Sequence, residues 1–442
     1  MDYKNVENSK MKRIEVQTNN TEEFNDEDKQ TLKSFENLIL KENEFYSQEE
    51  IKAIYEFIIK SKVIYLLEPS HVKLIISKMN FQNLNLIYFE ILKLLTVPSE
   101  LSFEVFQDFF IENNFNFQPI LTMDINMQNQ LVAIVSNILY DNNETIDYFI
   151  NNFAYYFFEI FTKELNYTYE IENLDDYFNL TYNFLPSIND QDTLMKIVHV
   201  FYIQIYNSNT LIQINALVGL YKIKRISYII NENYHNDRFF YKRLNEIGKY
   251  QSNASIYACY LFELFLNDRD ILFIDDCYLN IYDLIVFYLD LEKINNEMRT
   301  EVIYMASIAI VNNNFRRLID IEKIEQIMKK IISKYQSFSS SEKQKTIYFL
   351  AYFIDILPIE IIETYFYLDD FIDILVTSLD IIDDSTICLI RSIYSIIKNC
   401  DKIFLVISEN EDIIQCLKAN LDNQCKEVMG LSSELLKYIS SQ

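Results

Sequence analysis

Glycine is the residue type that this sequence lacks most clearly. Only three of its 442 residues are glycine, and only five are proline. Hairpin turns, bulges and strand-to-helix loops depend on glycine to reach positive φ and on proline to stop an element. The scarcity therefore argues against a hairpin-rich β fold. It also excludes a Walker loop and a dinucleotide fingerprint, which need clustered glycines so that backbone amides can approach phosphate.

Residue types that carry metal and nucleophile chemistry are sparse as well. The three histidines, His71, His199 and His235, lie far apart, and none belongs to an H-E-x-x-H unit. The six cysteines form no C-x-x-C pair, and none lies within a few residues of a histidine. We therefore expect reduced, mostly buried thiols, with no metal, no cofactor and no enzymatic activity.

Long apolar runs are missing too. The first residues, MDYKNVENSKMKRIEVQ, contain no apolar signal core, and no stretch of 18 or more uninterrupted apolar residues occurs anywhere. Neither secretion nor membrane spanning is supported by such a pattern. We expect a cytosolic or nuclear protein.

The charge is strongly acidic. The formal net charge at pH 7 is −26, and no concentrated basic patch offsets it. Such a chain repels phosphate backbones and anionic lipid, so nucleic acid and membranes are poor candidates for partners. A basic protein or peptide is the partner that electrostatics favours, although acidity can also serve solubility alone.

What the chain does contain is helical periodicity. Leu131, Ile134, Val135, Ile138 and Leu139 fall at i, i+3, i+4, i+7 and i+8, the spacing that lines one face of a helix. Asp, Asn and Ser, which are natural helix caps, are frequent in the short polar breaks between such segments. The same apolar pattern recurs at 84–95 and 257–265, and the breaks include VPSE (97–100), LPSINDQD (185–192) and SFSSSEK (337–343).

The spacing of these helices is nearly constant. One apolar residue near the end of each strong helix, taken as its anchor, is separated from the next anchor by 39 to 46 residues. Repeats of this length, with two or three helices each, are typical of HEAT and armadillo arrays, in which neighbouring units cover one another's apolar faces. The anchors are Leu94, Ile138, Phe184, Ile223, Leu264, Ile308, Phe353, Ile396 and Leu435.

Three segments resemble the last helix of an armadillo repeat. NALVGLYKI (215–223) is similar to the family pattern Asn-Ala-Leu-Trp-Ala-Leu-Ser-Asn-Ile, and its Gly219 stands where the family carries a small residue that lets the helix approach its neighbour. QLVAIVSNIL (130–139) and LTYNFL (180–185) resemble the same helix. The repeat length extends the resemblance over residues 47–442, and it implies a fold rather than a function.

The resemblance also implies a groove. In peptide-binding members such as importin alpha, asparagines on the last helices hold the backbone of an extended partner, and tryptophans four residues earlier stack on its basic side chains. Asn137 and Asn183 stand at the asparagine position here, and Glu263 and Glu434 occupy it in two other repeats. Tryptophan is absent from the whole chain, which argues against the standard recognition of nuclear-localisation peptides.

The sequence therefore predicts an all-α fold, a right-handed α-solenoid of about nine or ten armadillo/HEAT-like repeats over residues 31–442, after a mobile polar tail over residues 1–30. The predicted function is a non-enzymatic scaffold or adaptor that binds protein partners, with basic segments held along an acidic concave surface. The alternatives are an importin alpha-like nuclear transport adaptor and a structural or regulatory subunit that binds other proteins through the edges of the solenoid. A helical enzyme would require His, Cys or carboxylates clustered in one pocket.

Overall fold

The computed structural model is built from helices. Within the described residues every regular element is helical and none is a strand, as the sequence predicts. The structure describes residues 26–41, 44–60, 62–79, 85–141, 143–164, 174–188, 190–226, 229–230, 237–250, 252–267, 275–291, 296–312, 317, 320–381, 384–422 and 425–442.

The first helix begins earlier than the predicted start of the repeats at residue 31. Helix α2 spans Asp26–Ile39, so the end of the predicted polar tail is helical, and the rest of that tail lies outside the described residues. Contacts between Cα atoms divide the chain into two compact units, residues 1–189 and 190–442. Each unit is described by itself.

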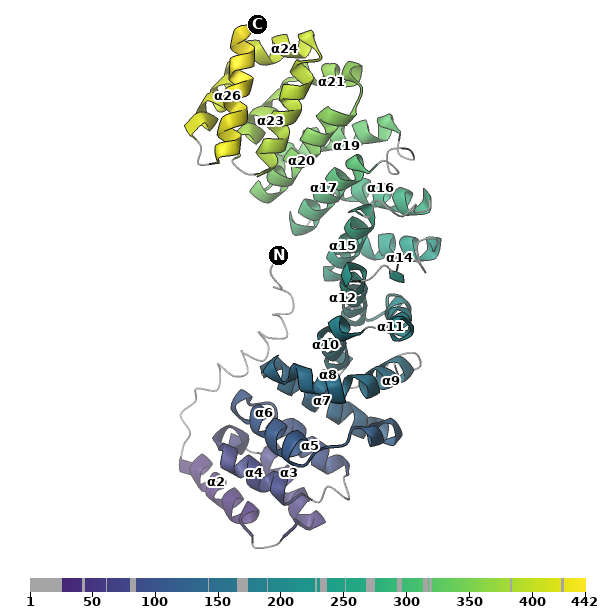
Figure 1. Cartoon of the computed structure of the whole chain (residues 1–442), viewed down its shortest axis with the longest axis vertical. Coiled ribbons are helices and arrows are strands. Elements are labelled where there is room, and N and C mark those ends of the chain that lie inside the picture. Colours follow the sequence, from purple (N-terminus) through teal and green to yellow (C-terminus); the bar gives the residue numbers. More distant parts are fainter. Residues whose placement is uncertain are drawn as a thin grey trace. The chain divides into compact units, whose positions relative to one another are not determined.

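In the first unit, each helix packs against helices that are close to it in the chain, and most of these contacts join alternate helices (Figure 1). Helices α3, α5, α7 and α10 contact one another in that order and form one row, while α2 contacts α4 and α4 contacts α6. The α-helices after α2 are α3 (Gln48–Lys60), α4 (Pro69–Ser77), α5 (Leu86–Leu95), α6 (Ser99–Val105), α7 (Ile125–Asp141), α8 (Ile146–Asn152), α9 (Ala154–Glu164) and α10 (Leu174–Phe184). A π-helical turn follows α6 at Phe106–Glu112, and short 3-10 turns occupy Lys62–Leu66, Gln118–Thr122, Asn143–Thr145 and Leu185–Ser187.

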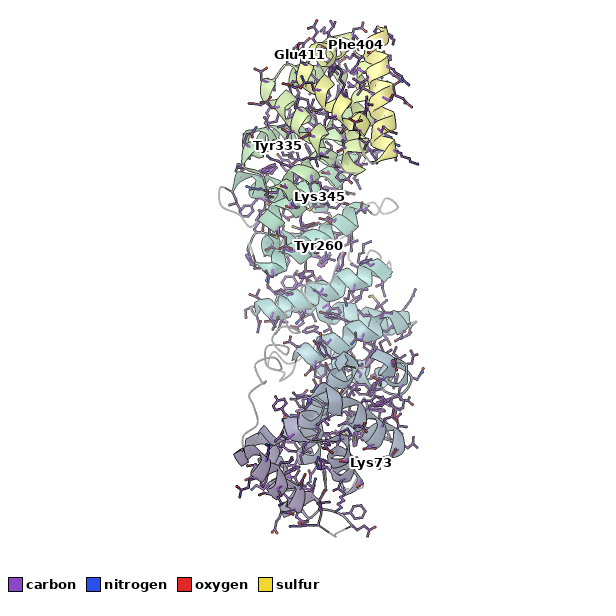
Figure 2. The ribbon with its side chains drawn as sticks, turned by 90° about the vertical axis from the view of Figure 1, so that its left-hand side faces the viewer. Lys73, Tyr260, Tyr335, Lys345, Phe404 and Glu411 are labelled. Atoms are coloured by element: carbon purple, nitrogen blue, oxygen red, sulfur yellow. The ribbon has the colours of Figure 1, made fainter. Side chains whose placement is uncertain are left out.

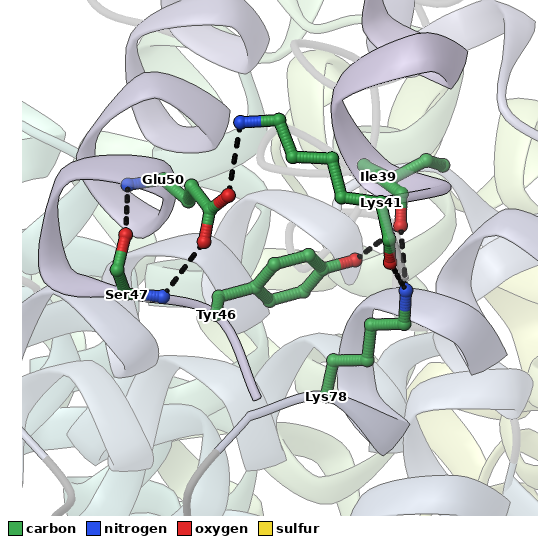
Figure 3. A network of polar contacts seen from close by, with 6 residues as sticks. All are labelled: Ile39, Lys41, Tyr46, Ser47, Glu50 and Lys78. Carbon is green, nitrogen blue, oxygen red and sulfur yellow. Dashed lines mark hydrogen bonds and ion pairs between the residues drawn. The ribbon is translucent and has the colours of Figure 1, made fainter. Parts of the chain in front are cut away.

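A polar network fixes the start of this unit (Figure 3). The Tyr46 hydroxyl and the Lys78 ammonium both donate to the carbonyl oxygen of Ile39, at 3.0 and 3.2 Å, and so tie the end of α2 to the end of α4. Glu50 accepts from the Lys41 ammonium and from the backbone N–H of residue 47, both at 2.9 Å. These hydrogen bonds, led by the one from Lys41, lower the pKa of Glu50 to about 2.

The second unit has two rows of helices. The inner row consists of helices that each contact the next: α12 (Thr210–Ile226), α15 (Asn253–Asn267), α17 (Asn296–Val311), α20 (Ser340–Ile356), α23 (Asp384–Ile397) and α26 (Lys426–Ser441). The outer row covers it with α11 (Gln191–Gln204), α14 (Arg238–Gly248), α16 (Asp275–Asp290), α19 (Ile321–Lys334), α22 (Asp369–Asp380) and α25 (Glu411–Ala419). In the last two repeats a third helix precedes the outer one, α21 (Ile359–Phe366) or α24 (Asp401–Glu409), and 3-10 turns lie at Tyr335–Ser337 and Asn420–Asp422.

The predicted anchors fall one to a helix. They lie in α5, α7 and α10 of the first unit and in the six inner helices of the second unit. Polar contacts between repeats have the same period: the Asn312 amide donates to the carbonyl of Leu266 at 2.8 Å, and the Asn420 amide donates to that of Leu379 at 3.2 Å. Their sequence separations are 46 and 41 residues. The predicted period of 39 to 46 residues is thus the step from one repeat to the next.

Polar caps replace glycine at the helix boundaries. Asp190, from the predicted break LPSINDQD, accepts from the backbone of Thr193 and caps α11. Ser339, from the break SFSSSEK, forms a capping box with Glu342 at the start of α20. Among the described residues no glycine has a positive φ, and Asn114 is the non-glycine residue that does. Few glycines are needed because capped polar turns join the helices.

Candidate functional site

The residues predicted to line a groove differ in exposure. Asn137 is only 2% exposed, and its amide donates to the Thr96 hydroxyl at 3.0 Å, so this side chain joins α7 to the end of α5. Asn183 and Glu434 are exposed, and Glu263 is half-buried. A partner backbone could reach Asn183 and Glu434 directly, whereas the buried amide of Asn137 serves packing between repeats.

Gly219 lies at a close helix contact. It is buried in α12, and a Cβ atom built there would stand 2.4 Å from the ring of Phe201 in α11. Such a distance is far below ordinary van der Waals contact, so no side chain fits unless the ring moves. Helices α11 and α12 can therefore pack this closely only because residue 219 has no side chain.

A pocket opens on the inner row where α15, α17 and α20 pack together. Its volume is about 280 Å³. Ser307 and Tyr352, which line it, directly precede the anchors Ile308 and Phe353, just as Asn137 precedes Ile138. Tyr348 lies four residues before Tyr352, where the family pattern carries tryptophan. The pocket thus lies on the face that the armadillo resemblance implies. Its other lining residues are Leu266, Asn267, Tyr304, Ile308, Val311, Asn312 and Lys345.

Two carboxyl groups meet between α15 and α17. Glu263 on α15 and Glu301 on α17 are hydrogen-bonded to each other. Oε1 of Glu263 and Oε2 of Glu301 are buried and have no hydrogen-bond partner among the described residues. A buried acceptor that lacks a donor costs about 1 to 3 kcal/mol. The two carboxyl groups can satisfy each other only if one of them keeps its proton and donates it.

Lys345 and Tyr304 line the pocket and also interact electrostatically with Glu263 and Glu301. The Lys345 ammonium lies 4.0 Å from the centre of the Tyr304 ring, a cation–π contact between α20 and α17. The positive charge of Lys345 acts on both Glu263 and Glu301, and both glutamates act on the Tyr304 hydroxyl. In Figure 2, Lys345 and Tyr260 of α15 lie on the same side of the second unit.

Burial is the largest cause of the pKa shifts of Glu263 and Glu301. Desolvation raises the pKa of Glu263 well above its ordinary value; Glu301 raises it further through its charge and the hydrogen bond between them, while Lys345 lowers it. Desolvation also raises the pKa of Glu301, against the lowering effects of Lys345 and Glu263. A proton shared between the two carboxyls explains these directions, because two adjacent buried carboxylates cannot both ionise cheaply.

Replacing Glu263 with glutamine is expected to flatten the dependence of stability on pH. A carboxyl whose pKa is raised by folding binds more protons in the folded state than in the unfolded state, so stability falls as pH rises through the interval between the two values. The melting temperature of the wild type should fall as pH rises above the ordinary range of a glutamate carboxyl, and that of Glu263→Gln should fall less, because the pKa of Glu263 is raised in the folded chain. Thermal unfolding at increasing pH measures the difference.

Glu434→Gln is the matched control, because Glu434 holds the same repeat position in α26 but is exposed. Its curve should keep the slope of the wild type. Parallel curves for all three proteins would show that Glu263 does not hold the proton.

Comparisons with known proteins inform the fold. An engineered protein of known crystal structure is similar over 93% of this chain and 99% of its own, with a TM-score of 0.60 and 14% identity. The chain is an all-α solenoid of helical repeats. At that identity the similarity extends to the fold and no further. No protein-family model matches the chain, and no curated protein sequence matches it.

Two further structures are similar at lower TM-scores. A chain from the structure of Kap95p with RanGDP, reported in the context of nuclear import complex assembly, has a TM-score of 0.49 and 11% identity; the match covers 93% of this chain and 57% of that one. UNC-45 from Drosophila melanogaster has a TM-score of 0.27 and 9% identity, with 93% and 70% of the two chains covered.

The acidity of the chain is not concentrated on the inner row. Helix α12 carries three basic residues and no acidic one. Helices α16 and α22, in the outer row, carry four acidic residues each and no basic one. The expectation of an acidic groove is therefore too broad, because a net charge does not say which helix of a repeat bears it. Within the inner row, Glu263 and Glu301 are two acidic residues whose carboxyl groups lie together.

Among the described residues, no group of three or more His, Cys, Asp or Glu could hold a metal ion. Burial raises the pKa of the Cys259 thiol in α15 well above its ordinary value, so this sulfur stays protonated and is a poor nucleophile. No helix in the described ranges is long and apolar enough to cross a membrane.

Sequence reasoning missed three members of the site: Glu301, Tyr304 and Lys345. Each lies off the positions that the armadillo pattern marks, and each is brought to Glu263 by the packing of a neighbouring repeat. Glu301 and Lys345 are 44 residues apart, so a search for charged residues at the repeat period would have found this pair. Glu263 and Glu301 are 38 residues apart, which is shorter than the repeat period, so the same search would have missed them.

Proposed function

We propose that this chain is a non-enzymatic protein-interaction scaffold, and that the inner row of its second unit binds a basic segment of a partner. The observation that carries the proposal is the pocket between α15, α17 and α20, which is lined by Tyr304, Tyr348 and Tyr352. The negative charges of Glu263 and Glu301 act on the hydroxyl of Tyr304. Tyrosine is common at interface hot spots because one end of its ring is apolar and the other donates a hydrogen bond. Carboxylates favour lysine and arginine in the partner. We place this role in the cytosol or nucleus.

A pull-down with the full chain tests this function. Bound proteins should be enriched in exposed basic segments, and raising the salt from about 0.05 M to 0.5 M should release them, because the Debye length shrinks severalfold over that range. Partners without such segments that stay bound at high salt would contradict the proposal.

A structural or regulatory subunit is the second candidate, and a surface of the outer layer favours it. Tyr367 and Leu368, between α21 and α22, are 59% and 47% exposed. Asp369 and Asp370, also exposed, follow them directly. Large apolar side chains beside acidic ones are typical of a contact surface for another protein. Partners that resist high salt and are lost on Tyr367→Ser would support this role over the first.

The importin alpha-like adaptor is the narrower form of the first candidate. At the family's tryptophan position the pocket offers Tyr348, which can stack on a basic side chain less strongly than tryptophan does. The binding mode would then depend on the carboxyl pair rather than on an indole ladder.

A further inference from the structure

Helix α14 of the outer row (Figure 1) has a net positive charge in a strongly acidic chain. It carries three basic residues and one acidic residue, whereas the net charge of the whole chain is −26. Helix α16, which packs against it, carries four acidic residues and no basic one, and the preceding outer helix, α11, carries one of each. Helix α14 is therefore a short basic surface that borders an acidic one.

Two basic side chains of α14 face solvent. Arg238 and Lys242 are four residues apart, so they lie on one face of the helix, and both are exposed. Among the described residues, neither forms an ion pair with a carboxylate. Arg243, in contrast, is held in place: its Nη1 lies 3.2 Å from Glu246, and its Nε donates to the carbonyl of Ile205 at 3.1 Å. Arg238 and Lys242 are therefore accessible to an anionic group from outside.

Three large aromatic side chains surround these cations. Phe239, Tyr250 and Tyr206 are 64%, 56% and 46% exposed. The Arg243 guanidinium lies 5.5 Å from the ring centre of Tyr206 and 6.0 Å from that of Tyr250, and the Arg238 guanidinium lies 5.3 Å from that of Phe239. The Tyr206 hydroxyl donates to the carbonyl of Phe239 at 3.4 Å. The rings and the cations thus form one continuous surface.

This surface has the composition of a contact site for another molecule. Exposed apolar side chains that are bordered by polar ones mark interaction sites, and aromatic residues and arginine are enriched at interfaces. Its charge selects an anionic partner. A long polyanion such as nucleic acid would also meet the four acidic residues of α16 and the negative field of the whole chain. A short acidic segment of a protein needs to contact only α14, and it can bring apolar side chains for the rings.

We propose that the α14 patch binds a short acidic segment of a partner protein. Carboxylates of the segment would bind Arg238 and Lys242, and one of its apolar side chains would pack on Phe239. The inference goes beyond the proposed function, because it concerns the outer row and does not use the pocket of the inner row. The α14 patch consists of Tyr206, Arg238, Phe239, Lys242, Arg243 and Tyr250.

A labelled octapeptide, Asp-Glu-Phe-Asp-Glu-Phe-Asp-Glu, tests the α14 patch, and its uncharged match is Asn-Gln-Phe-Asn-Gln-Phe-Asn-Gln. Fluorescence anisotropy with the full chain gives the affinity of each peptide. The double variant Arg238→Gln with Lys242→Gln should bind the acidic peptide about tenfold more weakly than the wild type, because it removes two charge contacts. It should not change the binding of the uncharged peptide. Phe239→Ser should weaken both peptides about fivefold, because it removes apolar contact area.

The double variant Arg391→Gln with Lys329→Gln is the matched control. It makes the same charge change at side chains that are 59% and 67% exposed on other helices, and it should bind like the wild type. Thermal melting of each variant shows whether it is folded.

Three results would overturn the α14 patch as a site for acidic segments. The first is equal binding of the acidic and the uncharged peptide by the wild type, and the second is equal binding of the acidic peptide by the two double variants. The third is a labelled thymidine octanucleotide that binds as tightly as the acidic peptide and is lost with Arg238 and Lys242, which would make the patch a nucleic-acid site. None of these results bears on the binding of basic segments to the inner row, so the proposed function is tested separately.

Discussion

Replacing Glu342 with glutamine is expected to lower the free energy of unfolding by about 3 to 5 kcal/mol, because the change leaves Arg299 buried without a counter-charge. Arg299 on α17 and Glu342 on α20 are only 6% and 0% exposed, and their side chains form an ion pair between adjacent inner helices. The Arg299 guanidinium also lies 5.1 Å from the ring centre of Phe338. The midpoint of urea unfolding in the full chain measures the loss.

Glu342 has a second role that makes it harder to replace. Its Oε2 accepts from the backbone N–H of Ser339 at 2.6 Å, and its own N–H donates to the Ser339 hydroxyl at 3.4 Å, which completes the capping box of α20. One side chain therefore both starts a helix and fastens it to the preceding repeat. A capping contact of this kind is worth about 1 kcal/mol.

An exposed pair of the same chemistry provides the control. Arg391 and Glu427 are 59% and 51% exposed, so Glu427→Gln should cost no more than about 1 kcal/mol. The double variant Arg299→Met with Glu342→Leu should lose less than the two single changes added together, since it removes both charges at once. An unfolding midpoint for Glu342→Gln equal to that of Glu427→Gln would contradict the role of the buried pair.

Gly219→Leu is the second change with a large expected effect. The side chain would overlap the Phe201 ring, and overpacking of a tight core typically costs about 1 to 3 kcal/mol, occasionally more. Gly219→Ala is more diagnostic. Alanine in the interior of a helix normally adds about 1 kcal/mol of stability relative to glycine, but here its Cβ would lie 2.4 Å from the ring. We expect the melting temperature to fall for both variants.

Gly430 supplies the matched control for Gly219. It lies within α26, and a Cβ atom built there has no neighbour within 4 Å. Gly430→Ala should therefore stabilise the chain by up to about 1 kcal/mol. Adding Phe201→Leu to Gly219→Ala should recover part of the lost stability, because leucine is smaller than the phenylalanine ring that the new Cβ would meet. A Gly219→Ala variant that melts at or above the wild-type temperature would show that the contact with Phe201 is not tight.

The fold was predictable because the repeats use only local rules. Each inner helix contains an apolar anchor such as Ile223 or Ile308, and the breaks between helices supply caps such as Asp190 and Ser339. Periodicity and capping are properties of adjacent residues, so they can be read from the sequence without knowing which helices touch.

The site was predictable only in part. The armadillo pattern located the face that carries Ser307, Tyr348 and Tyr352, but it did not show that Asn137 is buried against Thr96. The burial of a polar side chain depends on the rotation of each helix against its neighbours, which a pattern within one repeat does not contain. The pairing of Glu263 with Glu301 depends on the same rotation.

The one-repeat spacing of the polar contacts has a mechanical consequence for the second unit. Bonds such as those from Asn312 to Leu266 and from Asn420 to Leu379 span 46 and 41 residues, so the rupture of one repeat frees only the chain between neighbouring attachment points. At about 3.3 to 3.6 Å per residue, each event releases about 140 to 165 Å of extended backbone. Under tension this unit would lengthen in steps of nearly equal size, one step for each repeat that unfolds.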